Sequence, residues 1–233
     1  MSPLLRRRLL LAALVLPLAG LMWLAARAGI ASLYYFQAAF ALDHWQQQAP
    51  AVADYQQAAT AINQASALQP DNPHYLLMQA KINEWGWHSG YLNTEALAGN
   101  EALYQRAIAL RPDWPVAYAD YGYFLGFSQF RLTDAWTQMA LARQHGAYLP
   151  QVQQKFLTLS FQYWPYWSAG QKAEIFKYLQ QTLFGHLSGQ AISLVRQFKL
   201  QRQSCLYLSR RAATEPQWPQ VERQLCTEAS PAP

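Results

Sequence analysis

The feature that most constrains this chain is a pattern, A-x-A-L-x-P-D-x-P, that occurs twice. The first copy covers residues 65–73 and the second covers residues 107–115, so the first prolines, Pro70 and Pro112, are 42 residues apart. Proline cannot continue a helix, because it lacks a backbone N–H and its ring clashes with the preceding turn. Each copy therefore ends one helix and begins another, which predicts a stack of helix pairs.

The residues that follow each first proline predict how the next helix begins. Asp71 and Asp113 are predicted to cap it, since a carboxylate accepts hydrogen bonds from the first N–H groups of a helix. Pro73 and Pro115 suit the first turn, where the missing N–H costs nothing. Strand patterns are weak elsewhere, and the chain is rich in Ala, Leu and Gln, which favour helix. Helices are predicted at residues 51–68, 73–85, 99–110, 115–127, 132–144, 149–163, 171–184 and 187–200.

Between residues 55 and 145 the chain resembles the tetratricopeptide repeat (TPR) family. The residues that carry the resemblance are Ala65, Leu68, Pro70, Ala107, Leu110, Pro112, Tyr118, Tyr121 and Gly122. Tyr118 and Tyr121 stand where that family has Trp and Leu, and the period is 42 rather than about 34 residues because of an insertion near residues 86–99. The resemblance implies an all-α fold of antiparallel helix pairs, an α-solenoid, whose surface binds partner proteins.

The N-terminus has the pattern of a membrane anchor. Arg6, Arg7 and Arg8 precede an uncharged run of 18 residues from Leu9 to Ala26, which is just long enough to span hydrocarbon as a helix. Three arginines before the run and only Arg27 after it predict a cytoplasmic N-terminus and an exported remainder. A cleaved signal peptide is the alternative, because residues 26–28 are A-x-A-like.

Four parts are predicted along the chain. Residues 1–27 form the basic tail and transmembrane anchor, and residues 28–50 a juxtamembrane helix that lies either along the membrane or on the first repeat. Residues 51–200 form the TPR-like domain, and residues 201–233 a C-terminal tail.

From Ala28 onward the chain has 14 basic and 13 acidic residues, so its basic character is mainly a topology signal and does not indicate nucleic-acid binding. Residues 172–211 are nevertheless basic, with seven bases and one acid, either as a solvated face or as a patch for lipid headgroups or an acidic partner.

The two cysteines, Cys205 and Cys226, lie in this tail. In an exported chain an even and low cysteine count favours a disulfide, which would stabilise the fold by roughly 3 kcal/mol. Two free buried thiols are the alternative. No metal site is expected, since no histidine or third cysteine is near either residue in the sequence.

Motifs of enzymes are missing from the sequence. It has no G-x-S-x-G, P-loop or G-x-G-x-x-G motif, and no two histidines are spaced for a metal site on one helix. Glu84 and His88 are four residues apart, but Gly86 between them is predicted to end the helix. Asp113 and Asp120 are interpreted as a cap and part of a solvated face. We therefore expect no catalytic residues, no cofactor and no metal.

Aromatic residues in loops are the remaining candidates for binding. The glycine-flanked insertion carries Trp87 and Tyr91, and a second loop carries Trp164, Tyr166 and Trp167. Sugar rings stack on such side chains, so these residues are candidate contacts for a glycan or a partner protein. Packing or membrane contact is the alternative for the same residues.

The layout of the chain also resembles a family of bacterial accessory proteins. A short basic tail, one span and a divergent TPR-like exported domain resemble the VpsP-type proteins of exopolysaccharide biosynthesis. The resemblance implies a non-enzymatic, single-pass inner-membrane protein whose periplasmic domain is an adaptor for a polysaccharide synthesis or export machine. The alternatives are a carbohydrate-binding or glycan-modifying envelope component and a general envelope assembly factor.

Overall fold

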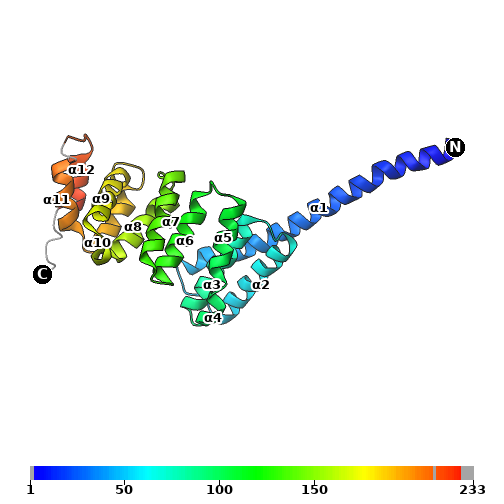
Figure 1. Cartoon of the computed structure of the whole chain (residues 1–233), viewed down its shortest axis with the longest axis horizontal. Coiled ribbons are helices and arrows are strands. Elements are labelled where there is room, and N and C mark those ends of the chain that lie inside the picture. The colour runs from blue at the N-terminus through cyan, green and yellow to red at the C-terminus, as the bar shows by residue number, and fades with distance from the viewer. Residues whose placement is uncertain (1–2, 212–213, 227–233) are drawn as a thin grey trace. The chain divides into compact units, whose positions relative to one another are not determined.

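A computed structural model describes residues 3–211 and 214–226, together with the side chains of those residues except 4–12. The described residues are all-α, with one short 3-10 helix (Figure 1). They divide into two compact units, Met1–Pro112 and Asp113–Pro233, called here the first and the second unit. The division falls at the second repeated proline, inside the stretch that the sequence analysis treats as one TPR-like domain. The side chains of Arg6, Arg7 and Arg8 and the last seven residues of the predicted tail lie outside the described part.

The first unit is built on a long N-terminal helix. It contains α1 (Pro3–Trp45), α2 (Val52–Leu68), α3 (Pro73–His88), α4 (Thr94–Leu97) and α5 (Asn100–Leu110). Helix α1 packs on α2 and α3, α2 packs on α3, and α3 packs on α5. Figure 1 shows the N-terminal part of α1 extending beyond the other helices of this unit.

The two halves of α1 have different surroundings. Within the described part, α1 is the one helix long and apolar enough to cross a membrane, and both an anchor and a signal sequence have this property. Large apolar side chains from Leu14 to Leu24 are 51–71% exposed. Further along, Ala31, Ala38 and Trp45 are buried in the core of the first unit. Their spacing of seven residues puts them on one stripe of the helix, so the juxtamembrane helix packs on the first helix pair, one of the two alternatives above.

The repeated loops end and begin helices as predicted, but the predicted caps are wrong. Pro73 and Pro115 are the first residues of α3 and α6, so the cap is the residue directly before each of them. At α3 this residue is Asn72, whose side chain accepts a hydrogen bond from the His74 N–H at 3.0 Å. At α6 it is Trp114, which makes no side-chain cap. Asp71 instead pairs with Arg106 at 2.5 Å.

The second unit continues the sequential packing. It contains α6 (Pro115–Phe127), α7 (Leu132–Gly146), α8 (Pro150–Gln162), the 3-10 helix η1 (Trp164–Tyr166), α9 (Ala169–Leu183), α10 (Ser188–Gln197), α11 (Gln201–Arg211) and α12 (Trp218–Leu225). Helix α6 packs on α7 and α8, α8 on α9 and α10, and α12 on α10 and α11. Helix α9 begins with a capping box that Ser168 and Gln171 form. Helices α4, α11 and α12 were not predicted from the sequence.

The C-terminal tail is helical and cross-linked. Cys205 on α11 and Cys226, the residue after α12, form a disulfide with a Cα–Cα distance of 5.7 Å. Both cysteines are therefore oxidised, and neither is a free thiol. Buried Leu208, Trp218 and Val221 join this end to the core of the second unit.

Asp120 is buried, so its interpretation as part of a solvated face is wrong. Its side chain is 1% exposed and forms an ion pair with Lys155 of α8. A buried carboxylate is costly unless a charge and hydrogen bonds compensate it. The ion pair therefore links α6 to α8 inside the second unit.

Gly86 lies inside α3, so the prediction that it ends this helix is wrong. The helix runs on to His88, and a Cβ at Gly86 would lie 2.5 Å from two ring atoms of Tyr55 on α2. Tyr55 is itself buried, and its ring packs against the rings of Trp45 and Tyr91. The glycine is thus needed for the close approach of α2 and α3.

We expect Gly86→Ala to destabilise the first unit by about 1–3 kcal/mol, because the Tyr55 ring has to shift within a packed core. Gly99→Ala is the matched control, since a Cβ at Gly99 meets no atom within 4 Å. Hydrogen exchange of α2 and α3 in the full chain measures the difference. Equal exchange in the two variants would show that α2 and α3 do not pack as described.

Candidate functional site

The first pair of predicted contact residues lies at the end of α3, which holds Trp87, and in the loop that follows it, which holds Tyr91. Tyr91 donates a hydrogen bond from its hydroxyl to the Pro50 carbonyl at 2.8 Å, and its ring is 5.5 Å from that of Tyr55. Trp87 is half-buried, with its indole nitrogen 3.5 Å from the Thr94 hydroxyl. The Tyr91 hydrogen bond fastens its loop to the segment between α1 and α2, and the Trp87 contact joins the end of α3 to the start of α4.

The second predicted group separates into three environments. Trp167 is buried and its indole N–H donates to the Ser160 carbonyl at 2.8 Å, so it belongs to the core. Trp164 packs edge-on against Phe176 at 5.0 Å and lies under the Lys172 ammonium. Tyr166 is 63% exposed. Of this group, Tyr166 alone is available for an external ring contact over most of its surface.

Tyr166 is part of a larger group of aromatic residues that the sequence analysis missed. We call Phe127, Phe130, Tyr163 and Tyr166 the aromatic surface. The Phe130 ring lies edge-on to those of Tyr166 at 5.4 Å and Tyr163 at 5.6 Å, and Tyr163 lies 5.5 Å from Phe127. The residues come from the end of α6, the α6–α7 loop, the residue between α8 and η1, and η1 itself, which are adjacent in the second unit because α6 packs on α8.

Phe130 has an unusual backbone conformation for its type. Its φ is 52°, in the left-handed region, where a bulky residue is rare and glycine is favoured. The apolar ring is nevertheless 56% exposed, so burial does not compensate the backbone strain. Strained residues of this kind concentrate at functional sites, which makes Phe130 a candidate for function.

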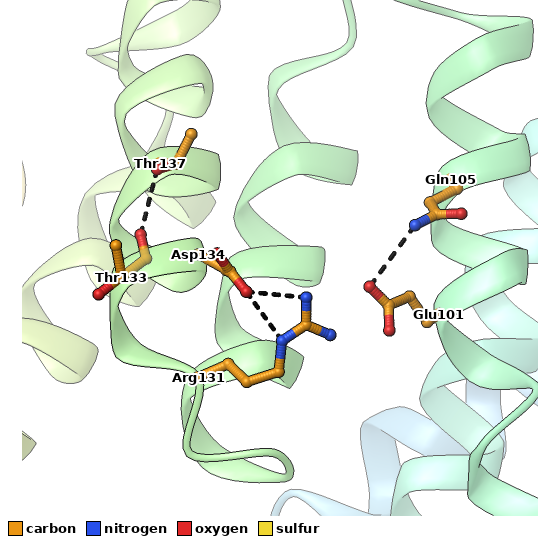
Figure 2. A network of polar contacts seen from close by, with 6 residues as sticks. All are labelled: Glu101, Gln105, Arg131, Thr133, Asp134 and Thr137. Carbon is orange, nitrogen blue, oxygen red and sulfur yellow. Dashed lines mark hydrogen bonds and ion pairs between the residues drawn. The ribbon is translucent and has the colours of Figure 1, made fainter.

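The loop that carries Phe130 is held on both sides. Arg131 donates its backbone N–H to the Leu125 carbonyl at 2.9 Å, which folds the loop back over the end of α6. Figure 2 shows the Arg131 guanidinium reaching Asp134 in the first turn of α7, with both N···O distances at 2.8 Å. Thr137 donates to the Thr133 carbonyl one turn further on. Phe130 is therefore presented from a fixed loop.

The aromatic surface has the chemistry for contacting apolar ring faces. Tyr163 donates its hydroxyl hydrogen bond to the Gly126 carbonyl at 3.0 Å, which fixes its ring. Burial, and then the neighbouring Tyr166 phenol, raise the pKa of Tyr163 above its ordinary value, so this phenol stays neutral. Neutral, preoriented aromatic side chains with exposed ring area are well suited to binding partly apolar ligands.

Glu84 and His88 lie one turn apart on the same helix, because α3 continues through Gly86. The Tyr104 hydroxyl donates a hydrogen bond to Glu84, and burial lowers the pKa of His88. Among the described residues, no group of three His, Cys, Asp or Glu side chains could hold a metal ion.

The residues that carry the repeat resemblance lie mainly inside the two units. Ala65 and Ala107 are fully buried, and Tyr121 is nearly so. A Cβ at Gly122 would lie 3.1 Å from the Ala135 carbonyl, so this glycine permits the close approach of α6 and α7. Comparison of the chain with protein-family models, curated proteins and solved structures finds no match.

Proposed function

We propose that this protein is a membrane-anchored helical adaptor of the bacterial envelope that assists polysaccharide synthesis or export. Its N-terminus would be cytoplasmic and both units periplasmic, and its helix pairs would hold partner proteins beside the membrane. The observation that carries the proposal is the construction of α1. It is one unbroken helix whose early part is apolar and exposed and whose later part is core, so the proposed anchor and the first unit form one continuous element.

Two further observations support the membrane topology. A cavity of about 520 Å³ separates Leu24 and Arg27 of α1 from the first repeated loop, residues 68–73. Polar residues of this loop thus lie level with Arg27, the first charge after the apolar run, where the outer membrane interface is expected. The disulfide supports an oxidising compartment such as the periplasm.

The adaptor role rests on the helix-pair packing and on the two resemblances described above. TPR-like pairs bind proteins through their stacked surfaces, and the VpsP-type layout associates such a domain with exopolysaccharide machinery.

The topology has a direct test in cells. A phosphatase fused after Pro233 is expected to be active, and the intact mass of the purified protein is expected to include the N-terminal arginines. An inactive fusion would contradict export. A mass that begins after Ala26 would contradict the anchor and favour a signal peptide.

The adaptor role is tested by photo-crosslinking in living cells. A crosslinker replaces exposed Gln64 on α2 or exposed Gln154 on α8, and Leu18 in the apolar run serves as the lipid-facing control. We expect adducts with a polysaccharide polymerase or transporter from the first two positions. Adducts restricted to outer-membrane assembly or cell-division proteins would contradict the polysaccharide role and favour a general assembly factor.

A second candidate function, glycan binding, is favoured by the aromatic surface. We expect Phe130→Gly to weaken glycan binding about tenfold, since one ring contact contributes about 1–1.5 kcal/mol. The same change is expected to leave stability unchanged or to raise it, because glycine accepts a φ of 52° without strain. Glycan-array and titration measurements on the full chain would test this.

The matched control for the glycan experiment is Tyr148→Ala. Tyr148 is 72% exposed and lies outside the aromatic surface, so its removal deletes a comparable exposed ring. Tyr166→Ala is expected to act like Phe130→Gly. If Tyr148→Ala weakened glycan binding as much as Phe130→Gly does, this location of the site would be contradicted. The same holds if binding depended on Trp87 and not on Phe130 and Tyr166.

A further inference from the structure

The second unit contains a cavity of about 1050 Å³ beside its C-terminal disulfide. It is lined from α10, α11 and α12, the last two of which the sequence analysis treated as a tail. This volume is at the upper end of those typical of small-molecule sites. The cavity is therefore large enough for an organic ligand, and much larger than one inorganic ion needs.

The charges around this cavity are strongly unequal. Arg196, Lys199 and Arg202 line it, and Glu222 is the one acidic residue among its lining residues. Two positive charges are thus in excess. These three bases are among the seven that the sequence concentrates between residues 172 and 211. Folding brings these three exposed bases to the lining of one cavity.

Two of the three cations are held in place by the backbone. Arg196 donates from its guanidinium to the Gln224 carbonyl, which ties α10 to α12 and restricts the side chain. Lys199 has a φ of 56°, in the left-handed region that favours glycine. The Leu200 N–H donates to the Val195 carbonyl at 2.9 Å, which holds the turn at Lys199 closed. A lysine at this strained position beside a cavity is a feature expected of a binding site.

The rest of the lining is apolar or cross-linked. Leu206 on α11 and Leu225 on α12 add apolar area to the cavity, and the Cys205–Cys226 disulfide joins the two helices that carry them. The helices on two sides of the cavity are therefore covalently held together. Separating them would open the cavity on the side of α12, which carries Glu222 and Leu225.

We propose that this cavity binds a phosphate monoester, with its phosphate against Arg196, Lys199 and Arg202 and its organic part against Leu206 and Leu225. A phosphate monoester carries a charge of about −1.5 to −2 at neutral pH, which matches the excess of two positive charges. Its oxygens accept charge-assisted hydrogen bonds from arginine and lysine. The site is independent of the adaptor role proposed above, and the monoester can belong to a soluble molecule or to a lipid headgroup.

The experiment uses the full chain in nanodiscs of phosphatidylcholine. In one arm glucose 1-phosphate is titrated, and in the other phosphatidic acid replaces part of the phosphatidylcholine. Hydrogen exchange of residues 196–206 is the common readout, with calorimetry for the soluble arm. We expect saturable protection of residues 196–206 from hydrogen exchange in at least one arm, and the arm that gives it identifies the source of the monoester. The variant Lys199→Gln/Arg202→Gln is expected to lose affinity at least tenfold.

Matched variants separate a specific site from general charge attraction. Lys177→Gln/Arg210→Gln removes the same charge from the second unit outside the cavity lining and is expected to bind as the unaltered protein does. Cys205→Ser/Cys226→Ser is expected to weaken binding while exchange of α6 to α8 stays unchanged. Failure of both arms to give saturable protection overturns the proposal, and so does equal weakening by the two double-charge variants.

Discussion

We expect Trp45→Ala to destabilise the first unit by about 3–5 kcal/mol, the range found when a large buried aromatic residue is truncated. Trp45 is the last residue of α1 and is 2% exposed. Its ring lies 6.0 Å from that of Trp85 on α3 and 6.5 Å from that of Tyr55 on α2. The substitution therefore leaves a cavity where three helices meet.

The functional consequence of this substitution follows from the continuity of α1. If the end of α1 no longer packs on α2 and α3, the first unit remains attached to the proposed anchor but is no longer held rigidly against it. Hydrogen exchange of α2 and α3 in the full chain is expected to rise steeply. Exchange in the second unit is the internal reference.

Trp23→Ala is the matched control, because Trp23 is on the same helix but is 70% exposed. Its loss is expected to leave exchange in the first unit within the error of the measurement. If the two tryptophan variants had the same effect, α1 would not be part of the core of the first unit, and the main support for a rigid anchor would be lost.

The second large effect is expected for Lys155→Met, at about 3 kcal/mol for the second unit. Removing one partner of a buried ion pair takes away a compensating charge from the other, which costs more than the pair itself contributes. Asp120 is almost fully buried and Lys155 is about one-quarter exposed, so the carboxylate is the group that stays buried without the lysine charge. Chemical denaturation, with exchange of α6 and α8 as a local probe, measures the loss.

Two further variants test whether charge or packing is responsible. Asp120→Leu/Lys155→Met removes both charges and is expected to recover most of the lost stability, because apolar replacement of a buried pair is often neutral or stabilising. Lys177→Met, at an exposed lysine of the same unit, is expected to have little effect. If the double variant were no more stable than Lys155→Met, the ion pair would not be the cause.

Helix ends were predictable where one residue type decides them locally. Pro73 and Pro115 begin helices as predicted, and Pro150 begins α8 one residue after the predicted start at residue 149. The cap before Pro73 was misassigned by one residue, because the prediction counted from Pro70 and not from the proline that starts the helix. Gly86 was misinterpreted because glycine favours a helix end in sequence, whereas here the ring of Tyr55, 31 positions earlier, requires it.

The candidate sites were only partly predictable. Tyr166 was singled out from the sequence, but Phe130 was not, although an aromatic residue between Gln129 and Arg131 in an interhelical loop is a signal that could have found it. Trp167 was proposed for binding together with Tyr166 and is a core residue, because its indole N–H reaches a carbonyl seven residues back. The basic residues of the cavity were noticed as a charge run, but their convergence depends on helices that were not predicted.

By itself, the sequence determined the helical class, most helix boundaries, the single apolar helix at the N-terminus and the cysteine pair available for a bridge. These properties depend on residues that act within a turn or two of the chain, as prolines, caps and apolar runs do. The tertiary structure alone decided that the second half of α1 is core, that Asp120 is buried against Lys155, that Phe130 joins Tyr166, and that three cations surround one cavity. Each of these depends on packing between helices distant in sequence, where burial and close approach, and not local preference, determine what a residue does.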